Sequence, residues 1–113
     1  MITYNINNID KIIKNNGKQV ILFGAGQIGE MCLFAMRQRN INVDFFCDSS
    51  KLKQEKIING IKVISSENLE KFDQKTNIFI SNNYVSTINK QLKKNNFENI
   101  YNCVEFFENT DFK

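Results

Sequence analysis

Three glycines at fixed spacing are the residues of this sequence best suited to do chemistry. The apolar run Val20-Ile21-Leu22-Phe23 leads into Gly24-Ala25-Gly26-Gln27-Ile28-Gly29, and a helix-patterned segment follows at once. A G-x-G-x-x-G turn between a strand and a helix suits a phosphate, because the N–H groups at the helix start are free to bind it. We therefore expect all six loop residues to take part in a nucleotide site: Gly24, Ala25, Gly26, Gln27, Ile28 and Gly29.

Each glycine has its own expected role in this loop. Gly24 allows the tight turn off the strand, and Gly26 removes a side chain where a diphosphate would approach the backbone. Gly29 lets the helix pack closely on the strand.

Asp48 is the second chemical feature, 19 residues after Gly29 and at the end of another apolar stretch. A carboxylate there is placed to accept hydrogen bonds from ribose hydroxyls, and it opposes a 2′-phosphate, which favours NAD-like over NADP-like ligands. Ser49 shares this position, while Lys51 and Lys53 could pair with a phosphate. The alternative is that Asp48 only forms a turn with its own backbone.

Ser81, Asn82 and Asn83 follow a later apolar run and precede another helical pattern. Ligands of open α/β sheets bind across such strand ends, so these small polar groups could contact a ribose, a base or a sugar. Helix capping by Asn82 or Asn83 is an equally good interpretation, and the two roles are compatible.

The sequence offers few candidate catalytic residues, and we expect neither a catalytic residue nor a metal site. Histidine is absent, which removes the commonest general base and metal ligand. None of the three tyrosines has a lysine four residues later; those positions hold Asn8, Ile88 and Glu105. The three cysteines lie in helix or strand patterns and form no C-x-x-C, so we expect reduced, buried thiols: Cys32, Cys47 and Cys103.

Alternating helical and extended patterns must position these residues. We expect helices near 6–15 and 27–39, a further helix carrying Leu69 and Phe72 after Ser65 or Ser66, and another opened by Asn82-Asn83. Strands are expected near 18–23, 41–48, 61–64, 77–81 and 100–104, with a polar loop over 49–59 ending in an Asn59-Gly60 turn. This alternation predicts an α/β fold: an open parallel sheet of about five strands with helices on both faces.

The helix at 27–39 has a broad apolar surface. The residues expected to face the sheet are Ile28, Met31, Cys32, Ala35 and Met36, with Leu33 and Phe34 widening that surface. Asp44, near the start of its strand, is expected to be solvated.

Length, composition and charge limit the number of domains and the kinds of partner that this chain can have. The 113 residues suffice for a single domain over 1–113, with a core over about 18–104 and a short polar tail. A net charge of +3 with scattered lysines does not favour a nucleic-acid partner. No apolar run is long enough to span a membrane, and no secretory signal is evident, so we expect a cytoplasmic protein.

Several segments together resemble a known group of proteins. Leu22 to Gly29, Phe45 to Ser50, Ile58 to Ile64 and Ile80 to Asn83 resemble the Rossmann-like nucleotide-binding domain of bacterial polysaccharide-biosynthesis proteins, including nucleotide-sugar dehydratases and sugar N-acyltransferases. The resemblance spans about 18–104 and implies that the ligand is NAD or a UDP-linked sugar. Family members often carry consecutive acids where this chain has Ser49 and Ser50.

Three hypotheses follow for the function. The first is a nucleotide-binding domain serving surface-sugar biosynthesis, alone, as a homodimer or as part of a larger enzyme, and not catalytic as an isolated 113-residue chain. The second is a fragment of an NAD-dependent, sugar-modifying oxidoreductase. The third is a degenerate domain that binds no ligand and mediates assembly through Leu33, Phe34 or the Phe106-Phe107 tail.

Overall fold

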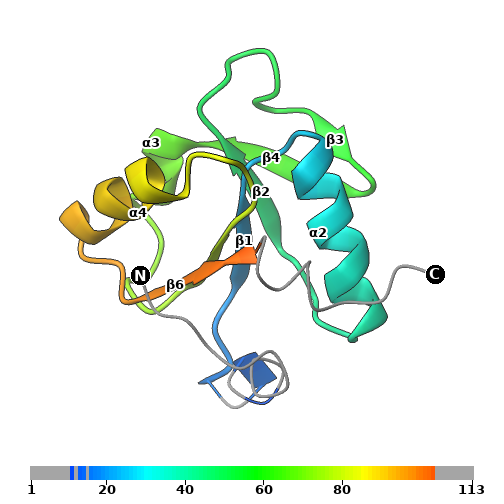
Figure 1. Cartoon of the computed structure of the whole chain (residues 1–113), viewed down its shortest axis with the longest axis horizontal. Coiled ribbons are helices and arrows are strands. Elements are labelled where there is room, and N and C mark those ends of the chain that lie inside the picture. The colour runs from blue at the N-terminus through cyan, green and yellow to red at the C-terminus, as the bar shows by residue number, and fades with distance from the viewer. Residues whose placement is uncertain (1–10, 12, 15, 104–113) are drawn as a thin grey trace.

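The computed structural model describes residue 11, residues 13–14 and residues 16–103 (Figure 1). The strands are β1 (Val20–Phe23), β2 (Phe45–Asp48), β3 (Ile57–Ile58), β4 (Ile61–Ser65), β5 (Asn77–Ile80) and β6 (Asn99–Asn102). The helices are α2 (Gln27–Gln38), α3 (Ser66–Leu69) and α4 (Val85–Lys94). Described residues 11, 13, 14 and 16 are helical, and the rest of the leading helix expected at 6–15 lies outside the described residues, as does the polar tail.

The strands form one six-stranded sheet in the order β3-β4-β2-β1-β5-β6. All neighbours in this order run parallel except the β3–β4 pair. The chain moves outward from β1 through β2 to β4 and then crosses back to β5 on the other side of β1. The predicted α/β fold with a parallel sheet is confirmed, and β1 stands where the direction of winding reverses.

Strand β3, which brings the sheet to six strands, corrects the sequence analysis, because only a polar loop was expected over 49–59. Ile57 and Ile58 pair antiparallel with Lys62 and Ile61 in a short hairpin. Its turn is the predicted Asn59-Gly60, where both residues have positive φ, +50° and +86°. Such a pair favours a two-residue hairpin loop, so the turn residues themselves bring β3 alongside β4.

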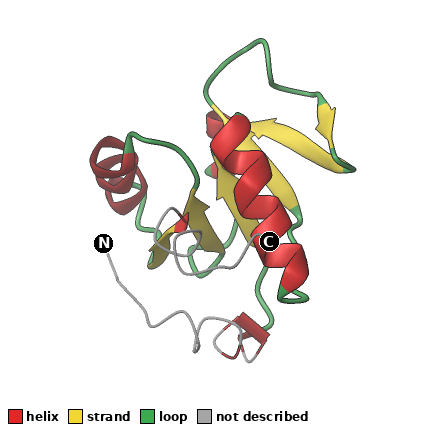
Figure 2. Cartoon of the chain, turned by 45° about the vertical axis from the view of Figure 1, so that its right-hand side comes forward, coloured by secondary structure: helices red, strands yellow, loops and turns green. Residues whose placement is uncertain are grey.

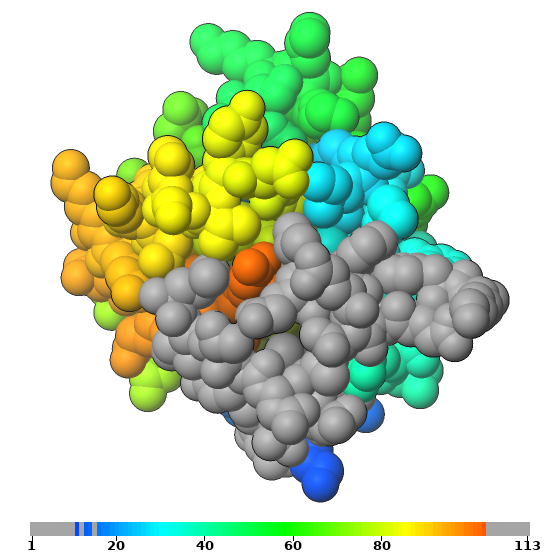
Figure 3. Space-filling view, viewed as in Figure 1, coloured from blue at the N-terminus to red at the C-terminus, as the bar shows by residue number. Residues whose placement is uncertain are grey.

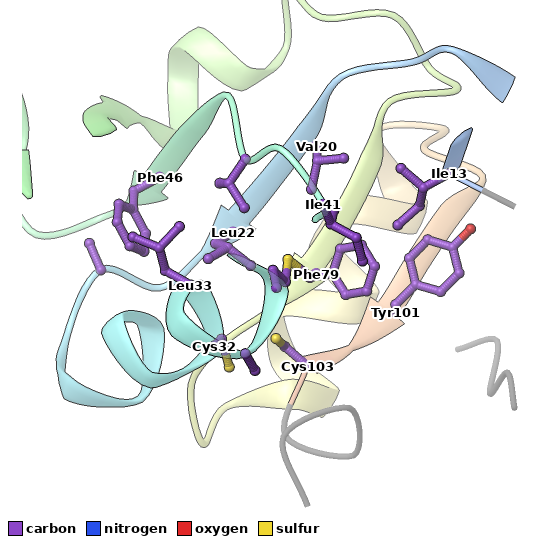
Figure 4. Packing of buried hydrophobic residues seen from close by; sticks show 14 of the residues in the cluster. Ile13, Val20, Leu22, Cys32, Leu33, Ile41, Phe46, Phe79, Tyr101 and Cys103 are labelled. Atoms are coloured by element: carbon purple, nitrogen blue, oxygen red, sulfur yellow. The ribbon is translucent and has the colours of Figure 1, made fainter. Parts of the chain in front are cut away.

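Apolar layers on both faces of the sheet hold the helices. Alternate strand residues point to opposite sides, so Leu22, Phe46 and Phe79 face α2, while Ile21, Cys47 and Ile78 face α3 and α4. Figure 2 shows α2 lying across one side of the sheet and α4 on the other. Figure 4 shows the α2 side, where Leu22, Leu33 and Phe46 pack together. β1 is buried along its whole length, as its unbroken apolar run predicts.

The sheet-facing side of α2 differs slightly from the expected one. Cys32, Ala35 and Met36 are buried as predicted, but Leu33 replaces Met31, which is 39% exposed. Phe34 is 49% exposed.

The strand predicted over 41–48 begins only at Phe45. Asn40 has positive φ, +59°, and the N–H of Ile41 donates to the carbonyl of Met36, so these residues close the end of α2. Asp44 is half-buried rather than solvated, because its carboxylate accepts a hydrogen bond of 2.8 Å from the N–H of Val20. It thereby fixes the start of β1.

Helix α3 begins where expected but is shorter than predicted. Ser65 caps it by accepting a hydrogen bond from the N–H of Asn68, and α3 already ends at Leu69, before Phe72. Phe72 lies beyond it and packs edge-on against Phe45. Within the described part of the chain, no helix has both the length and the apolar character that crossing a membrane requires.

Candidate nucleotide-binding site

Three strands end at the same level beside the reversal point of the sheet. Phe23 of β1 pairs with Cys47 of β2 on one side and with Ile80 of β5 on the other. The next residue along each strand is therefore Gly24, Asp48 and Ser81, respectively. Residues singled out separately in the sequence are thus brought to one edge, which is where open α/β sheets bind ligands.

A cavity of about 450 Å³ opens at this edge. That size suits a small-molecule site. Its walls come from the glycine loop, the segment after β2 and the segment after β5; the lining residues are Gly24, Gly26, Gln27, Ile28, Asp48, Ser49, Lys53, Ser81, Asn82, Asn83 and Tyr84. In Figure 3 the cyan start of α2 and the yellow segment after β5 adjoin on the surface. Of the residues predicted for the site, Ala25 and Gly29 are buried and do not line the cavity.

Gly24 lies where the glycine loop meets the end of β5. Its φ is +129°, and an added Cβ would come within 2.6 Å of the carbonyl oxygen of Ser81. The buried Ser81 hydroxyl donates a hydrogen bond of 2.8 Å to the Gly24 carbonyl. Ser81 therefore holds the loop in place, and no larger residue could replace Gly24 without displacing it.

The other two glycines differ sharply in their surroundings. A Cβ on Gly29 would collide with the carbonyl of Gly24 and press on Phe46, so Gly29 serves the packing of α2 on the sheet. A Cβ on Gly26 would meet nothing within 4 Å, because this residue faces the cavity. Gly26 is also the N-cap of α2, where no side chain supplies a capping bond. The helix start is thus open toward the cavity.

Asp48 is bound on both of its carboxylate oxygens. Oδ2 accepts a hydrogen bond of 2.9 Å from the N–H of Ala25, and Oδ1 accepts one of 2.8 Å from the N–H of Ser50. The second bond is the turn-forming role considered as the alternative. The first links the end of β2 to the glycine loop, a role that the sequence analysis did not foresee. A carboxylate has further lone pairs, so a ribose contact stays a prediction.

Lys53 and Tyr84 line the cavity but were not among the predicted site residues; the sequence offered Lys53, like Lys51, only as a possible partner of a phosphate. Lys53 is half-buried, and its ammonium donates to the carbonyl of Ala25 at 3.4 Å. Lys51 is exposed and is not among the lining residues. Tyr84, 71% exposed, stands at the rim. Its position directly after Asn82-Asn83 was the signal that could have identified it.

The segment after β5 forms a turn before its helix begins. Asn82 Oδ1 accepts a hydrogen bond of 2.8 Å from the N–H of Tyr84, and α4 starts at Val85 with Tyr84 as N-cap. The expectation that Asn82-Asn83 opens the helix is therefore wrong by two to three residues. Asn83 is exposed at the cavity wall.

All three cysteines are free and buried, as predicted. Burial, together with the smaller effect of the neighbouring Asp48 carboxylate, raises the pKa of the Cys47 thiol to about 12. Burial also raises the pKa of Cys103, and its hydrogen bond with Cys32 acts in the same direction. Thiolates are the reactive form, so neither Cys47 nor Cys103 suits a nucleophile. Across the described residues, no three potential ligands gather into a metal site.

The strand order, the parallel pairing and the glycine turn at the reversal point define a Rossmann-like fold. Solved structures agree. UDP-D-quinovosamine 4-dehydrogenase from Vibrio fischeri is 21% identical, with a TM-score of 0.56 over 74% of this chain and 75% of that one. A protein named RSP, solved in complex with beta-NADH, is 19% identical, with a TM-score of 0.61 over 85% of this chain and half of that one.

Aspartate semialdehyde dehydrogenase II from Vibrio cholerae, complexed with ASA, is 23% identical, with a TM-score of 0.53 over 74% of this chain and 30% of that one. No curated protein matches the sequence. Residues 16–100 match the family described as C2185-like, N-terminal, and the chain belongs to that family.

Proposed function

We propose that this chain binds a nucleotide, NAD or a UDP-linked sugar, at the cavity where β1, β2 and β5 end. The observation that carries the proposal is the open N-terminus of α2 beside Gly26, on which an added Cβ would point into empty space. Free N–H groups and the positive end of the helix dipole favour a phosphate at such a place.

The two sides of the cavity suit the two parts of such a ligand. Asp48 and Ser49 lie on one side of the glycine loop and suit a ribose; Asn82, Asn83 and Tyr84 lie on the other and offer amide groups and an aromatic ring. We propose a role in surface-glycan biosynthesis, as a binding module or part of a larger enzyme. Support comes from the resemblance to polysaccharide-biosynthesis domains and from the UDP-sugar dehydrogenase among the similar structures.

A second candidate is a fragment of an NAD-dependent oxidoreductase that modifies sugars. It is favoured by the two dehydrogenases among the similar structures and by the neighbour solved with NADH. The site itself argues less for it, because the sequence contains neither histidine nor a Tyr-x-x-x-Lys pair.

A thermal-shift panel tests the proposal. NAD, NADP, UDP-sugars, coenzyme A and S-adenosylmethionine are added singly to the purified chain. A ligand that binds only the folded state, at a concentration a hundred times its Kd, stabilises that state by about 2.7 kcal/mol, and this gain raises Tm clearly. We expect NAD or a UDP-sugar to raise Tm. A chain that none of the ligands stabilises would favour the degenerate assembly domain instead.

A further inference from the structure

Resting on the proposed function, we infer that Lys53 contacts the ligand's diphosphate and makes the site select phosphate-bearing ligands over nucleosides. Lys53 lies in the connection between β2 and β3, outside the glycine motif. Asp48 and Lys53 are the charged residues among the described residues that line the cavity. Selection for or against an anion therefore depends on these two side chains.

The Lys53 ammonium is directed at the glycine loop. Its donor–acceptor distance to the Ala25 carbonyl is 3.4 Å, the long end of hydrogen-bond geometry, and an ammonium carries three donors. Ala25 stands between Gly24 and Gly26, where the proposed diphosphate approaches the backbone. The carbonyl thus holds the lysine beside the expected phosphate position and leaves two of its N–H groups for other acceptors.

Asp48 does not form an ion pair with Lys53. The Asp48 oxygens accept from the backbone N–H groups of Ala25 and Ser50. Among the described residues, no ion pair joins Lys53 to a carboxylate. Lys53 is half-buried in the cavity wall, where salt screens a charge less than on the open surface. An anion entering the cavity therefore meets a positive group without a carboxylate partner.

Main-chain bonds fix the position of this lysine. The N–H groups of Lys53 and Gln54 both donate to the carbonyl of Ser50, and the Gln54 side chain donates to the carbonyl of Asp48 at 3.1 Å. This turn places Lys53 on the cavity and leaves Lys51 exposed away from it. Lys51 is therefore a matched control, with the same charge in the same loop.

The test compares the full chain with Lys53→Gln, Lys53→Arg and Lys51→Gln by calorimetric titration with UDP, NAD and NADP. Uridine is followed by NMR shift titration. Lys53→Gln should bind UDP and NAD about ten- to a hundredfold more weakly than the parent, because it loses a hydrogen bond to a charged group. Uridine binding should be unchanged. Lys53→Arg should retain most of the affinity, and Lys51→Gln should change it by about twofold or less. Circular dichroism and Tm show that each variant is folded.

The outcomes separate this inference from the proposed function. A parent chain that binds neither UDP nor NAD overturns both. A parent that binds them while Lys53→Gln binds equally well overturns the role of Lys53 alone. Equal losses in Lys51→Gln would indicate general charge attraction, and a loss confined to NADP would place the contact at the 2′-phosphate; either result overturns the diphosphate assignment.

Discussion

The carboxylate of Asp48 accepts a hydrogen bond of 2.9 Å from the backbone N–H of Ala25, which joins the end of β2 to the glycine loop. Ala25 is fully buried, so its N–H has no access to solvent at this position. Asp48 therefore positions the loop whether or not it also touches a ribose. Experiments on Asp48 have to separate loop positioning from ligand contact.

Asp48→Ala is predicted to destabilise the fold. It leaves the buried N–H of Ala25 without its acceptor, which costs about 1–3 kcal/mol. Urea unfolding measures this loss. Asp44→Ala is the matched control, because Asp44 accepts from the N–H of Val20 at the opposite edge of the sheet. We expect a similar loss of stability from both variants and weaker nucleotide binding only from Asp48→Ala.

The ribose contact of Asp48 is tested with paired ligands. The parent should bind NAD more tightly than NADP, because a 2′-phosphate would meet the Asp48 carboxylate. In Asp48→Ala that difference should shrink, since the repulsion is removed while Lys53 still lines the cavity. Calorimetry on both proteins decides the matter. If both discriminate between NAD and NADP to the same degree, Asp48 is a structural residue only.

Gly26→Val is predicted to abolish nucleotide binding and to keep the fold. The new side chain would enter the open space in front of α2, and poorer capping should cost about 1 kcal/mol or less. Gly29→Ala is the contrasting variant, because its Cβ would collide with the Gly24 carbonyl, and we expect a loss of about 2–3 kcal/mol. Tm and calorimetry are measured on both. Undiminished affinity in Gly26→Val would contradict the phosphate-loop assignment.

Stability should fall with rising pH above about 9. The unperturbed pKa of a cysteine is 9.0, and Cys47 in the folded chain has a pKa of about 12. The unfolded chain therefore releases this proton first, and the free energy of unfolding decreases between these values. Urea titrations at pH 8 to 11 measure the slope. Cys47→Ala should have a shallower slope, and an identical slope would show that Cys47 does not contribute.

We also predict no sustained oxidoreductase turnover by the isolated chain. No histidine and no Tyr-x-x-x-Lys pair is present to carry a proton. The absorbance of reduced nicotinamide is followed with NAD and a panel of UDP-sugars. Steady turnover that is lost in Gly26→Val would favour the oxidoreductase fragment over the binding module.

The sequence predicted best the features that have a local signal. β1 is a continuous apolar run that needs burial on both faces, and the Asn59-Gly60 pair favours one kind of turn. Both signals are local, so both were readable. The spacing from Gly29 to Asp48 similarly placed the acid at the correct edge.

Features that depend on distant contacts could not be predicted in this way. The bond from Asp48 to Ala25 spans 23 residues, and the one from Ser81 to Gly24 spans 57. Neither has a sequence pattern of its own. Lys53 was noticed as a charge near the site, but only the turn at Ser50 shows that it, and not Lys51, reaches the cavity.

The connection from β2 to β4 contains no helix in the described structure; it consists of a turn and the short strand β3. It is anchored near its middle, since the Gln54 side chain donates to the carbonyl of Asp48 and the N–H of Glu55 donates to the carbonyl of Val63. Just before these anchors, the side chains of Lys51 and Leu52 are exposed to solvent. Lys53 lies in the same segment and lines the cavity, so exchanging this residue is the natural way to engineer ligand preference without repacking either hydrophobic layer.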